Sequence, residues 1–280
     1  MSVVKLKRYR FLERDVDSFV VPTSALEVDS VICLPDDDCN ADAPKIGVIM
    51  ALENGYDGYV IDEPYVSALS AYDVNLRFLT YDNIATQIKN QQLDALLLIG
   101  GSFDSPAEYY LHQENLPDTH RLSKRSLAYL EALDCAKSYK MPVLGICAGF
   151  QMLAGYFGAK MYTNVIKELN SSLPHKFDKY QDAHAVSIVD NTKLATICGN
   201  KPEIMVNSIH TEGVAQVPDN ANIIISARSS DGNIEAVEVV GDWYALGVQW
   251  HPEYLWHRSL EAKNIFASFV NAANKYQKGE

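Results

Sequence analysis

The stretch PVLGICAGFQ, residues 142–151, joins a short apolar run to a segment with helical spacing. Residues 142–146 form a compact apolar run, as in a buried strand, and a helix is expected from residue 149 to about 157. Between them lies a Gly-x-Cys-x-Gly sequence centred on Cys147. Glycines two residues before and after the cysteine allow a sharp strand-to-helix turn to approach its neighbours closely. The stretch therefore predicts a strained turn that presents Cys147 at the carboxyl end of a strand.

Cys147 has the setting of a nucleophile. Its sulfur would lie at a helix N-terminus, where unpaired N–H groups and the helix dipole favour a thiolate. The alternative is a buried cysteine at the end of a core strand, but the strand and helix on either side favour the nucleophile. Cys33, Cys39, Cys135 and Cys198 lack this setting, and we expect inert thiols there.

From residue 45 onward, strand and helix candidates alternate along the chain. Apolar runs predict further strands at residues 46–51, 76–80 and 95–99. Helical spacing predicts helices at residues 65–72, 84–90, 122–139 and 260–276. This alternation is typical of an α/β fold with a mostly parallel central sheet flanked by helices.

The second half of the chain is different, because its strand candidates follow one another closely. They are residues 184–189, 204–208, 223–227, 234–240 and 245–249. Asp231-Gly232 gives a turn signal between two of these candidates. We therefore expect additional antiparallel strands in this half.

A cysteine nucleophile usually needs an imidazole that takes up its proton and returns it to the leaving amine. His251 follows the strand candidate at 245–249, at the same sheet edge as Cys147. Glu253 can turn back to hold the imidazole in the needed tautomer, and Pro252 stiffens the link between them. Alone, His-Pro-Glu is an ordinary surface turn. Together with the turn at Cys147, it predicts a Cys147–His251–Glu253 triad.

Two segments, GICAGFQ at residues 145–151 and GVQWHPE at residues 247–253, resemble the two hallmark motifs of class-I glutamine amidotransferases. The resemblance covers about residues 45 to 276 and implies a flavodoxin-like fold. Three further segments resemble the peptidase C26 branch, which contains γ-glutamyl-γ-aminobutyrate hydrolases and related γ-glutamyl hydrolases. They are DGNIEAVE at 231–238, VNSIH at 206–210, and Gly100-Gly101 followed by Pro106 and Tyr109. The branch contains free-standing hydrolases of γ-glutamyl amides that use no metal and no organic cofactor.

The resemblance also implies roles for individual residues. Cys147 would attack a γ-glutamyl carbonyl and form a glutamyl thioester, with His251 protonating the leaving amine. The backbone N–H groups of Ala148 and Gly101 would form the oxyanion hole. Substrate contacts are expected from Gly100, Gln151, Ser208 and His210, and no residue is expected to bind a metal. A helix-surface glutamine at 151 and a structural histidine at 210 are the alternatives.

The sequence departs from the C26 pattern near the expected acceptor side of the pocket. Thr211 and Glu212 stand where the branch often has a histidine and a glutamine. Phe103 occupies a position where aspartate is common, and Ser126 follows Arg125 where the branch has an Arg-Asp pair. These departures leave the triad intact, but they leave the amine half of the substrate open.

Composition and charge narrow the range of partners. The 280 residues are 48% hydrophobic and 21% charged, which is ordinary for a globular protein. A net charge of −12 makes nucleic acid and anionic membranes poor partners. Five cysteines without a CxxC pair, no apolar run long enough for a bilayer and no signal-peptide pattern favour the cytoplasm. We expect a small γ-glutamyl substrate, with a homo-oligomer possible.

Residues 1–44 are treated as an N-terminal extension of unknown role, and residues 45–280 as the catalytic domain. The acidic, proline-bounded residues 35–44 predict a loop or linker. The extension could be a partner-binding arm, a lid or an added strand.

Other interpretations remain open from the sequence. The chain could be a glutaminase subunit that delivers ammonia to a separate synthetase, or a non-catalytic binding module that retains the fold. Metal binding by His175, His184, His210 and His257 has no ligand spacing behind it.

Overall fold

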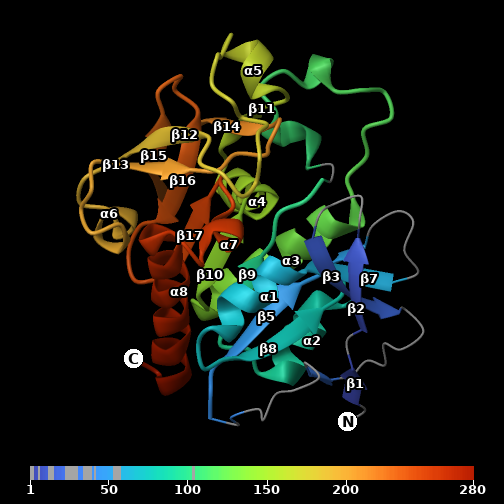
Figure 1. The fold of residues 1–280 in the computed structure, drawn as a ribbon. Coiled ribbons are helices and arrows are strands. Elements are labelled where there is room, and N and C mark those ends of the chain that lie inside the picture. Colours follow the sequence, from blue (N-terminus) through green and yellow to red (C-terminus); the bar gives the residue numbers. More distant parts are fainter. Residues whose placement is uncertain are drawn as a thin grey trace.

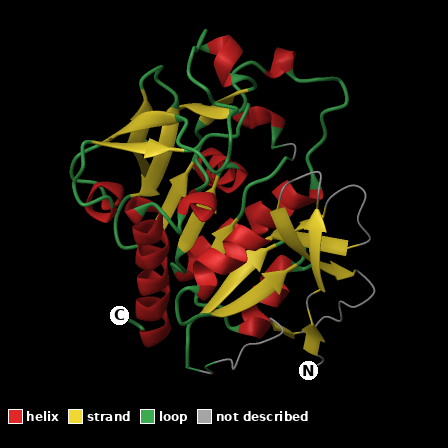
Figure 2. Ribbon diagram, in the orientation of Figure 1, coloured by secondary structure: helices red, strands yellow, loops and turns green. Residues whose placement is uncertain are grey.

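The computed structural model describes residues 40, 42–52, 58–102 and 105–280 in full. It also describes the backbone of four N-terminal strands: β1 (Val3–Lys5), β2 (Lys7–Phe11), β3 (Val16–Pro22) and β4 (Val31–Cys33). Phe103, Cys39 and most of the predicted linker at 35–44 lie outside the described residues, as does the side chain of Cys33. An 11-stranded sheet runs through the molecule, and helices cover both of its faces (Figures 1 and 2).

The parallel half of this sheet has the strand order β17-β10-β9-β5-β8. The bounds are β17 (Ala245–Val248), β10 (Val143–Ile146), β9 (Ala95–Leu98), β5 (Lys45–Ile49) and β8 (Asn75–Leu79). Every residue of β9, β10 and β17 is buried, as expected for parallel strands covered on both faces. In β9, Leu97 packs in one core cluster, whereas Leu96 and Leu98 pack in the other. The predicted α/β fold with a mostly parallel central sheet is confirmed.

The antiparallel half continues from β17 in the order β16-β15-β12-β13. The bounds are β16 (Ile234–Val239), β15 (Ile223–Ser229), β12 (His184–Ile188) and β13 (Glu203–Val206). The predicted turn at Asp231-Gly232 joins β15 to β16, and Gly232 has a φ of 94°, which glycine adopts without strain. Two strands that the sequence did not indicate, β11 (Lys160–Tyr162) and β14 (Gly213–Gln216), pair with each other beside β16.

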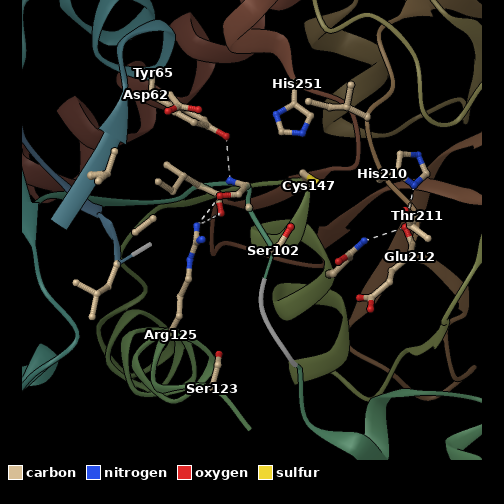
Figure 3. Close-up of a pocket in the computed structure, with 18 of the residues that line it drawn as sticks. Asp62, Tyr65, Ser102, Ser123, Arg125, Cys147, His210, Thr211, Glu212 and His251 are labelled. Atoms are coloured by element: carbon tan, nitrogen blue, oxygen red, sulfur yellow. Dashed lines mark hydrogen bonds between the residues drawn. The ribbon is translucent and has the colours of Figure 1, made fainter. Parts of the chain in front are cut away.

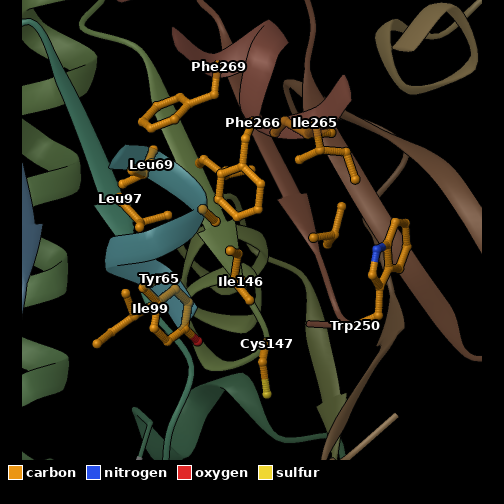
Figure 4. Packing of buried hydrophobic residues seen from close by; sticks show 14 of the residues in the cluster. Tyr65, Leu69, Leu97, Ile99, Ile146, Cys147, Trp250, Ile265, Phe266 and Phe269 are labelled. Atoms are coloured by element: carbon orange, nitrogen blue, oxygen red, sulfur yellow. The ribbon is translucent and has the colours of Figure 1, made fainter. Parts of the chain in front are cut away.

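Helices form a layer on each face of the sheet. One layer contains α1 (Glu63–Ser70), α6 (Lys193–Ile197), α7 (Pro252–Leu255) and α8 (Leu260–Lys278). Its core includes Leu69, Phe266 and Phe269, which pack beside the strand that leads to Cys147 (Figure 4). The other layer contains α2 (Ile84–Gln91), α3 (Lys124–Tyr139) and α4 (Ala148–Tyr156), whose core includes Tyr129 and Phe150. The remaining helical elements of the described residues are α5 (Val165–Glu168) and the 3₁₀ turns η2 (Ala107–Tyr109) and η3 (Gln113–Asn115).

A smaller four-stranded sheet lies at one side of the molecule, in the order β2-β3-β7-β6 (Figure 1). It combines two N-terminal strands with β6 (Ala51–Leu52) and β7 (Gly58–Asp62). β7 runs directly into α1, so this sheet adjoins the segment that carries Asp62 and Tyr65. β1 and β4 pair separately and in parallel. Among the described residues, no helix combines the length and the apolar character that a membrane crossing requires.

Candidate active site

Cys147 occupies a strained turn between β10 and α4. Its φ of 51° and ψ of −108° lie outside the basins that L-residues favour. The two flanking glycines are required by close contacts. A Cβ on Gly145 would lie 2.7 Å from the carbonyl oxygen of Gly149, and a Cβ on Gly149 would overlap the carbonyl oxygen of Leu98. The predicted strand–turn–helix geometry is therefore present.

His251 and Glu253 meet Cys147 at the carboxyl edge of the sheet. β10 and β17 are neighbours with Ile146 opposite Val248, so the residues that follow them emerge side by side. Nδ1 of His251 lies 2.6 Å from Oε1 of Glu253, and both side chains are buried. His251 and Cys147 also lie close to the same point beside Gly100: a Cβ there would be 2.7 Å from His251 Cε1 and 3.2 Å from Cys147 Cβ.

The environment of His251 favours its protonated form. Burial alone would lower the pKa of this imidazole. The charges of Glu253 and Cys147, and hydrogen bonds to both, outweigh burial and raise the pKa to about 10. Because Nδ1 faces Glu253, Nε2 is the ring nitrogen left for the thiol. Figure 3 shows His251 and Cys147 facing the same open space.

The main chain of His251 is fixed by Asn207. The side-chain oxygen of Asn207 accepts a hydrogen bond of 2.9 Å from the His251 N–H, and the side-chain nitrogen of Asn207 donates one of 2.9 Å to the His251 carbonyl. The same nitrogen donates to the carbonyl of Lys179 at 2.5 Å. Asn207 is fully buried, so it joins the VNSIH segment to the catalytic edge, a role that the sequence did not indicate.

The glycine loop after β9 is held from two sides (Figure 3). The Gly100 N–H donates to the Tyr65 hydroxyl at 2.9 Å, and the Arg125 guanidinium donates to the carbonyls of Gly100 at 2.5 Å and Ile99 at 3.1 Å. In a trans peptide, the Gly101 N–H points away from the Gly100 carbonyl. Gly101 has a φ of 139°, a conformation open mainly to glycine. Arg125, which is buried, therefore fixes the direction of the Gly101 N–H.

A pocket of about 1070 Å³ opens beside Cys147. Six of the predicted site residues line it: Gly100, Gly101, Cys147, Gln151, His210 and His251. Its lining also includes charged side chains of both signs, namely Asp62, Glu212, Lys124, Arg125 and Lys176.

Three of the predicted residues lie behind this lining. Glu253 is buried against Nδ1 of His251, and Ala148 is the buried first residue of α4. Ser208 is buried, and its hydroxyl donates to the carbonyl of His175 at 2.9 Å.

Gln151 and His210 both contact the main chain of Glu212. Nε2 of Gln151 donates to the Glu212 carbonyl at 3.0 Å and to Oε1 of Gln249 at 3.1 Å. Gln151 is buried, so the alternative of a helix-surface glutamine is wrong. Nδ1 of His210 lies 2.8 Å from the same carbonyl. Burial and the neighbouring His175 lower the pKa of His210 to about 3, which keeps its ring neutral.

The fold is that of class-I glutamine amidotransferase and glutaminase domains, as solved structures confirm. A putative GMP synthase component from Thermoplasma acidophilum gives a TM-score of 0.58 at 18% identity, covering 84% of this chain and 96% of that one. The glutaminase domain of the Trypanosoma brucei CTPS, with bound acivicin, gives 0.57 at 16% identity, covering 83% and 94%.

The peptidase C26 family matches residues 53–253, and the chain belongs to this family. The γ-glutamyl-γ-aminobutyrate hydrolase PuuD of Escherichia coli is 25% identical over 245 residues, which covers 83% of this chain and 94% of that protein. The chain is thus a hydrolase that acts on carbon–nitrogen bonds, as the sequence predicted.

Proposed function

We propose that this protein hydrolyses γ-glutamyl amide bonds with Cys147 as the nucleophile and a glutamyl thioester as the intermediate. One observation carries the proposal: Cys147, on a strained turn, and His251, held by Glu253, lie close together beside Gly100 and face one pocket. The family supports hydrolysis of a carbon–nitrogen bond, and the name of the E. coli relative supports a γ-glutamyl amide as the substrate.

The reaction has two halves. The Cys147 sulfur forms a bond to the γ-carbonyl carbon, and His251 gives its proton to the leaving nitrogen as the C–N bond breaks. Water then attacks the thioester while His251 takes up one of its protons. The C–S bond breaks, glutamate leaves, and the proton returns to the sulfur. Glu253 keeps the imidazole oriented and stabilises its charged form in both halves.

The oxyanion that forms in each half needs donors that are already in place. We assign the backbone N–H groups of Ala148 and Gly101. Ala148 follows the nucleophile at the start of α4, and the direction of the Gly101 N–H follows from the grip of Arg125 on the Gly100 carbonyl.

The pocket lining fits a zwitterionic head group. A γ-glutamyl compound carries an ammonium and a carboxylate at its α-carbon. Glu212 and Asp62 supply negative charge for the ammonium, while Lys124 and Lys176 supply positive charge for the carboxylate.

Covalent labelling tests the nucleophile. Acivicin should label Cys147, as identified by peptide mass spectrometry, and Cys147→Ser should abolish both labelling and hydrolysis. Cys135→Ser is the matched control, because Cys135 lies on α3 away from the pocket lining and burial raises the pKa of its thiol. In the Cys135→Ser variant, acivicin should label Cys147 at the wild-type rate. Labelling of another thiol in place of Cys147, or unchanged hydrolysis by Cys147→Ser, would reject the mechanism.

A substrate panel tests the reaction class. The purified chain alone should release amine from γ-glutamyl amines faster than ammonia from glutamine. Activity on glutamine only, and only with an added synthetase, would instead identify a glutaminase subunit.

A further inference from the structure

Three histidines and a glutamate converge behind the pocket wall. His175 precedes β12, His184 begins β12, His210 follows β13 and Glu235 lies in β16. One donor atom from each residue lies within 4.8 Å of the other three. All four side chains are buried. The sequence had grouped His257 with these histidines, but His257 is exposed, and Glu235 is the fourth member of the cluster.

Hydrogen bonds to carbonyl groups fix the protonation of two rings. Nδ1 of His210 lies 2.8 Å from the Glu212 carbonyl oxygen, and Nδ1 of His184 lies 3.2 Å from that of Ala185. A carbonyl oxygen only accepts, so each Nδ1 carries the proton. In a neutral imidazole the other nitrogen then has a lone pair, and in both residues Nε2 is the atom that faces the cluster.

Asp231 fixes the third ring. Its Oδ2 lies 2.7 Å from Nε2 of His175. The carboxylate also accepts hydrogen bonds from Ser171, Ser229 and the Asn233 N–H, so it acts as an ionised acceptor. The proton of a neutral His175 is therefore on Nε2, and its Nδ1 faces the cluster with a lone pair. A carboxylate behind a histidine is the usual outer partner of a metal ligand.

When the three rings are neutral, their inward nitrogens are thus all acceptors, and Oε1 of Glu235 accepts a hydrogen bond of 2.8 Å from the Asn233 side chain. Nδ1 of His175 and Nε2 of His210 lie 3.3 Å apart, and each lies 3.9 Å from Oε1 of Glu235. Nε2 of His184 is buried and has no hydrogen-bond partner among the described residues. Lone pairs and a carboxylate that face one buried space are unfavourable unless a cation lies between them.

We propose that this cluster binds one Zn²⁺ ion through His175 Nδ1, His184 Nε2, His210 Nε2 and Glu235 Oε1. Tetrahedral zinc with bonds of about 2.0–2.2 Å places its ligand atoms roughly 3.3–3.6 Å apart. The four atoms lie within 4.8 Å of one another, so side-chain rotations would bring them to this spacing. Four protein ligands leave no open position, which makes the site structural. The ion ties four separate segments together and fixes His210, which lines the pocket (Figure 3).

Metal binding to the full-length, untagged protein tests this proposal. Protein from zinc-replete medium should contain about one zinc per chain by elemental analysis. After removal with a chelator, Co²⁺ should produce the visible absorption of tetrahedral coordination. At a hundredfold excess of Zn²⁺ over its Kd, the stripped protein should melt about 5 °C higher than without metal.

Two variants and one control locate the site. His184→Asn keeps a donor for the Ala185 carbonyl but lacks Nε2, and Asp231→Asn removes the charge behind His175. Each substitution should raise the Kd for Zn²⁺ by about 10-fold or more. His257→Gln, at an exposed histidine outside the cluster, should bind like the wild type.

The alternative to a metal ion is a doubly protonated His175, whose Nδ1–H would donate a hydrogen bond to Nε2 of His210. Stripped wild-type protein that gives no tetrahedral Co²⁺ spectrum, or that binds Zn²⁺ no better than His184→Asn, would overturn the proposal. If His184→Asn does not fold, the Co²⁺ titration of the wild type decides alone.

Discussion

Nδ1 of His251 lies 2.6 Å from Oε1 of Glu253, and the two side chains have 7% and 0% of their surface exposed. Glu253 therefore sets both the tautomer and the charge of the imidazole. Glu253→Gln keeps the shape but removes the charge, and we expect kcat to fall roughly 10²- to 10⁴-fold. Steady-state hydrolysis of a γ-glutamyl amine measures this. Glu261→Gln, remote from the pocket lining, should keep the wild-type kcat, and a Glu253→Gln variant that matched it would contradict the triad.

The same pair makes stability depend on pH. In the folded protein Glu253 and Cys147 outweigh burial and raise the pKa of His251 to about 10, above its ordinary value of 6.5. The folded state thus holds this proton more tightly, so the stabilisation is complete below about pH 6.5 and is lost as the pH rises toward 10.

Urea unfolding at a series of pH values checks this effect. Wild type should exceed Glu253→Gln by about 3 kcal/mol in free energy of unfolding at pH 6, and the difference should shrink steadily toward pH 10. The difference in free energy of unfolding between wild type and Glu261→Gln should not change between pH 6 and pH 10. A Glu253→Gln difference that does not change with pH would contradict the raised pKa.

Where burial is continuous, the sequence predicted the elements to within a residue or two. The run at 95–99 became β9 (Ala95–Leu98), because four consecutive buried apolar residues suit a strand covered on both faces. The helix predicted at 122–139 begins at Lys124, because the hydroxyl of Ser123 accepts from the Ser126 N–H and caps it. The short strands β7 and β14 were not predicted, because they depend on partners far away in the chain, β3 and β11.

The site residues also divide into those that local sequence indicated and those that depend on distant contacts. Local motifs indicated Cys147 and His251, because a strained turn and a strand end leave a pattern of neighbouring residues. Asn207 and Arg125 stand in segments that resemble the C26 pattern, and Tyr65 stands in a predicted helix, but their neighbours in the sequence do not indicate which groups they contact. Each acts on the main chain of a residue between 25 and 44 positions away, so only the folded chain brings donor and acceptor together.

Arg125 should be a positioning residue for the oxyanion hole. One guanidinium nitrogen, Nη2, donates to the carbonyls of Ile99 and Gly100, while Nε and Nη2 also donate to the Tyr129 hydroxyl. Lysine keeps the charge but lacks the planar group that anchors this nitrogen through Tyr129. If the Gly101 N–H loses its direction, kcat of Arg125→Lys should fall about 10²-fold while KM changes little. Arg121→Lys, an exposed position just before the same helix, is the matched control and should retain wild-type values. A rise in KM with an unchanged kcat would assign Arg125 to substrate binding instead.

Gly100 should tolerate no side chain, because the base and the nucleophile both lie close to the position that its Cβ would occupy. An alanine Cβ would lie 2.7 Å from His251 Cε1, 3.0 Å from the Tyr65 hydroxyl and 3.2 Å from Cys147 Cβ. The His251 ring cannot easily retreat, because Glu253 holds its Nδ1. The added methyl group must therefore displace Gly100 or the thiol from the observed arrangement, or force the ring away from Glu253. Gly100→Ala should lose about 1–3 kcal/mol of stability to overpacking. Its hydrolysis and its labelling by acivicin should both slow by about 10²-fold, the cost expected for a displacement near 1 Å.

Measuring both the labelling rate and the thermal midpoint of Gly100→Ala separates the loss of reactivity from the loss of stability. A Gly100→Ala variant that melts at a lower temperature but is labelled at the wild-type rate would show that the close approach of His251 and Cys147 to Gly100 is not needed for the reaction.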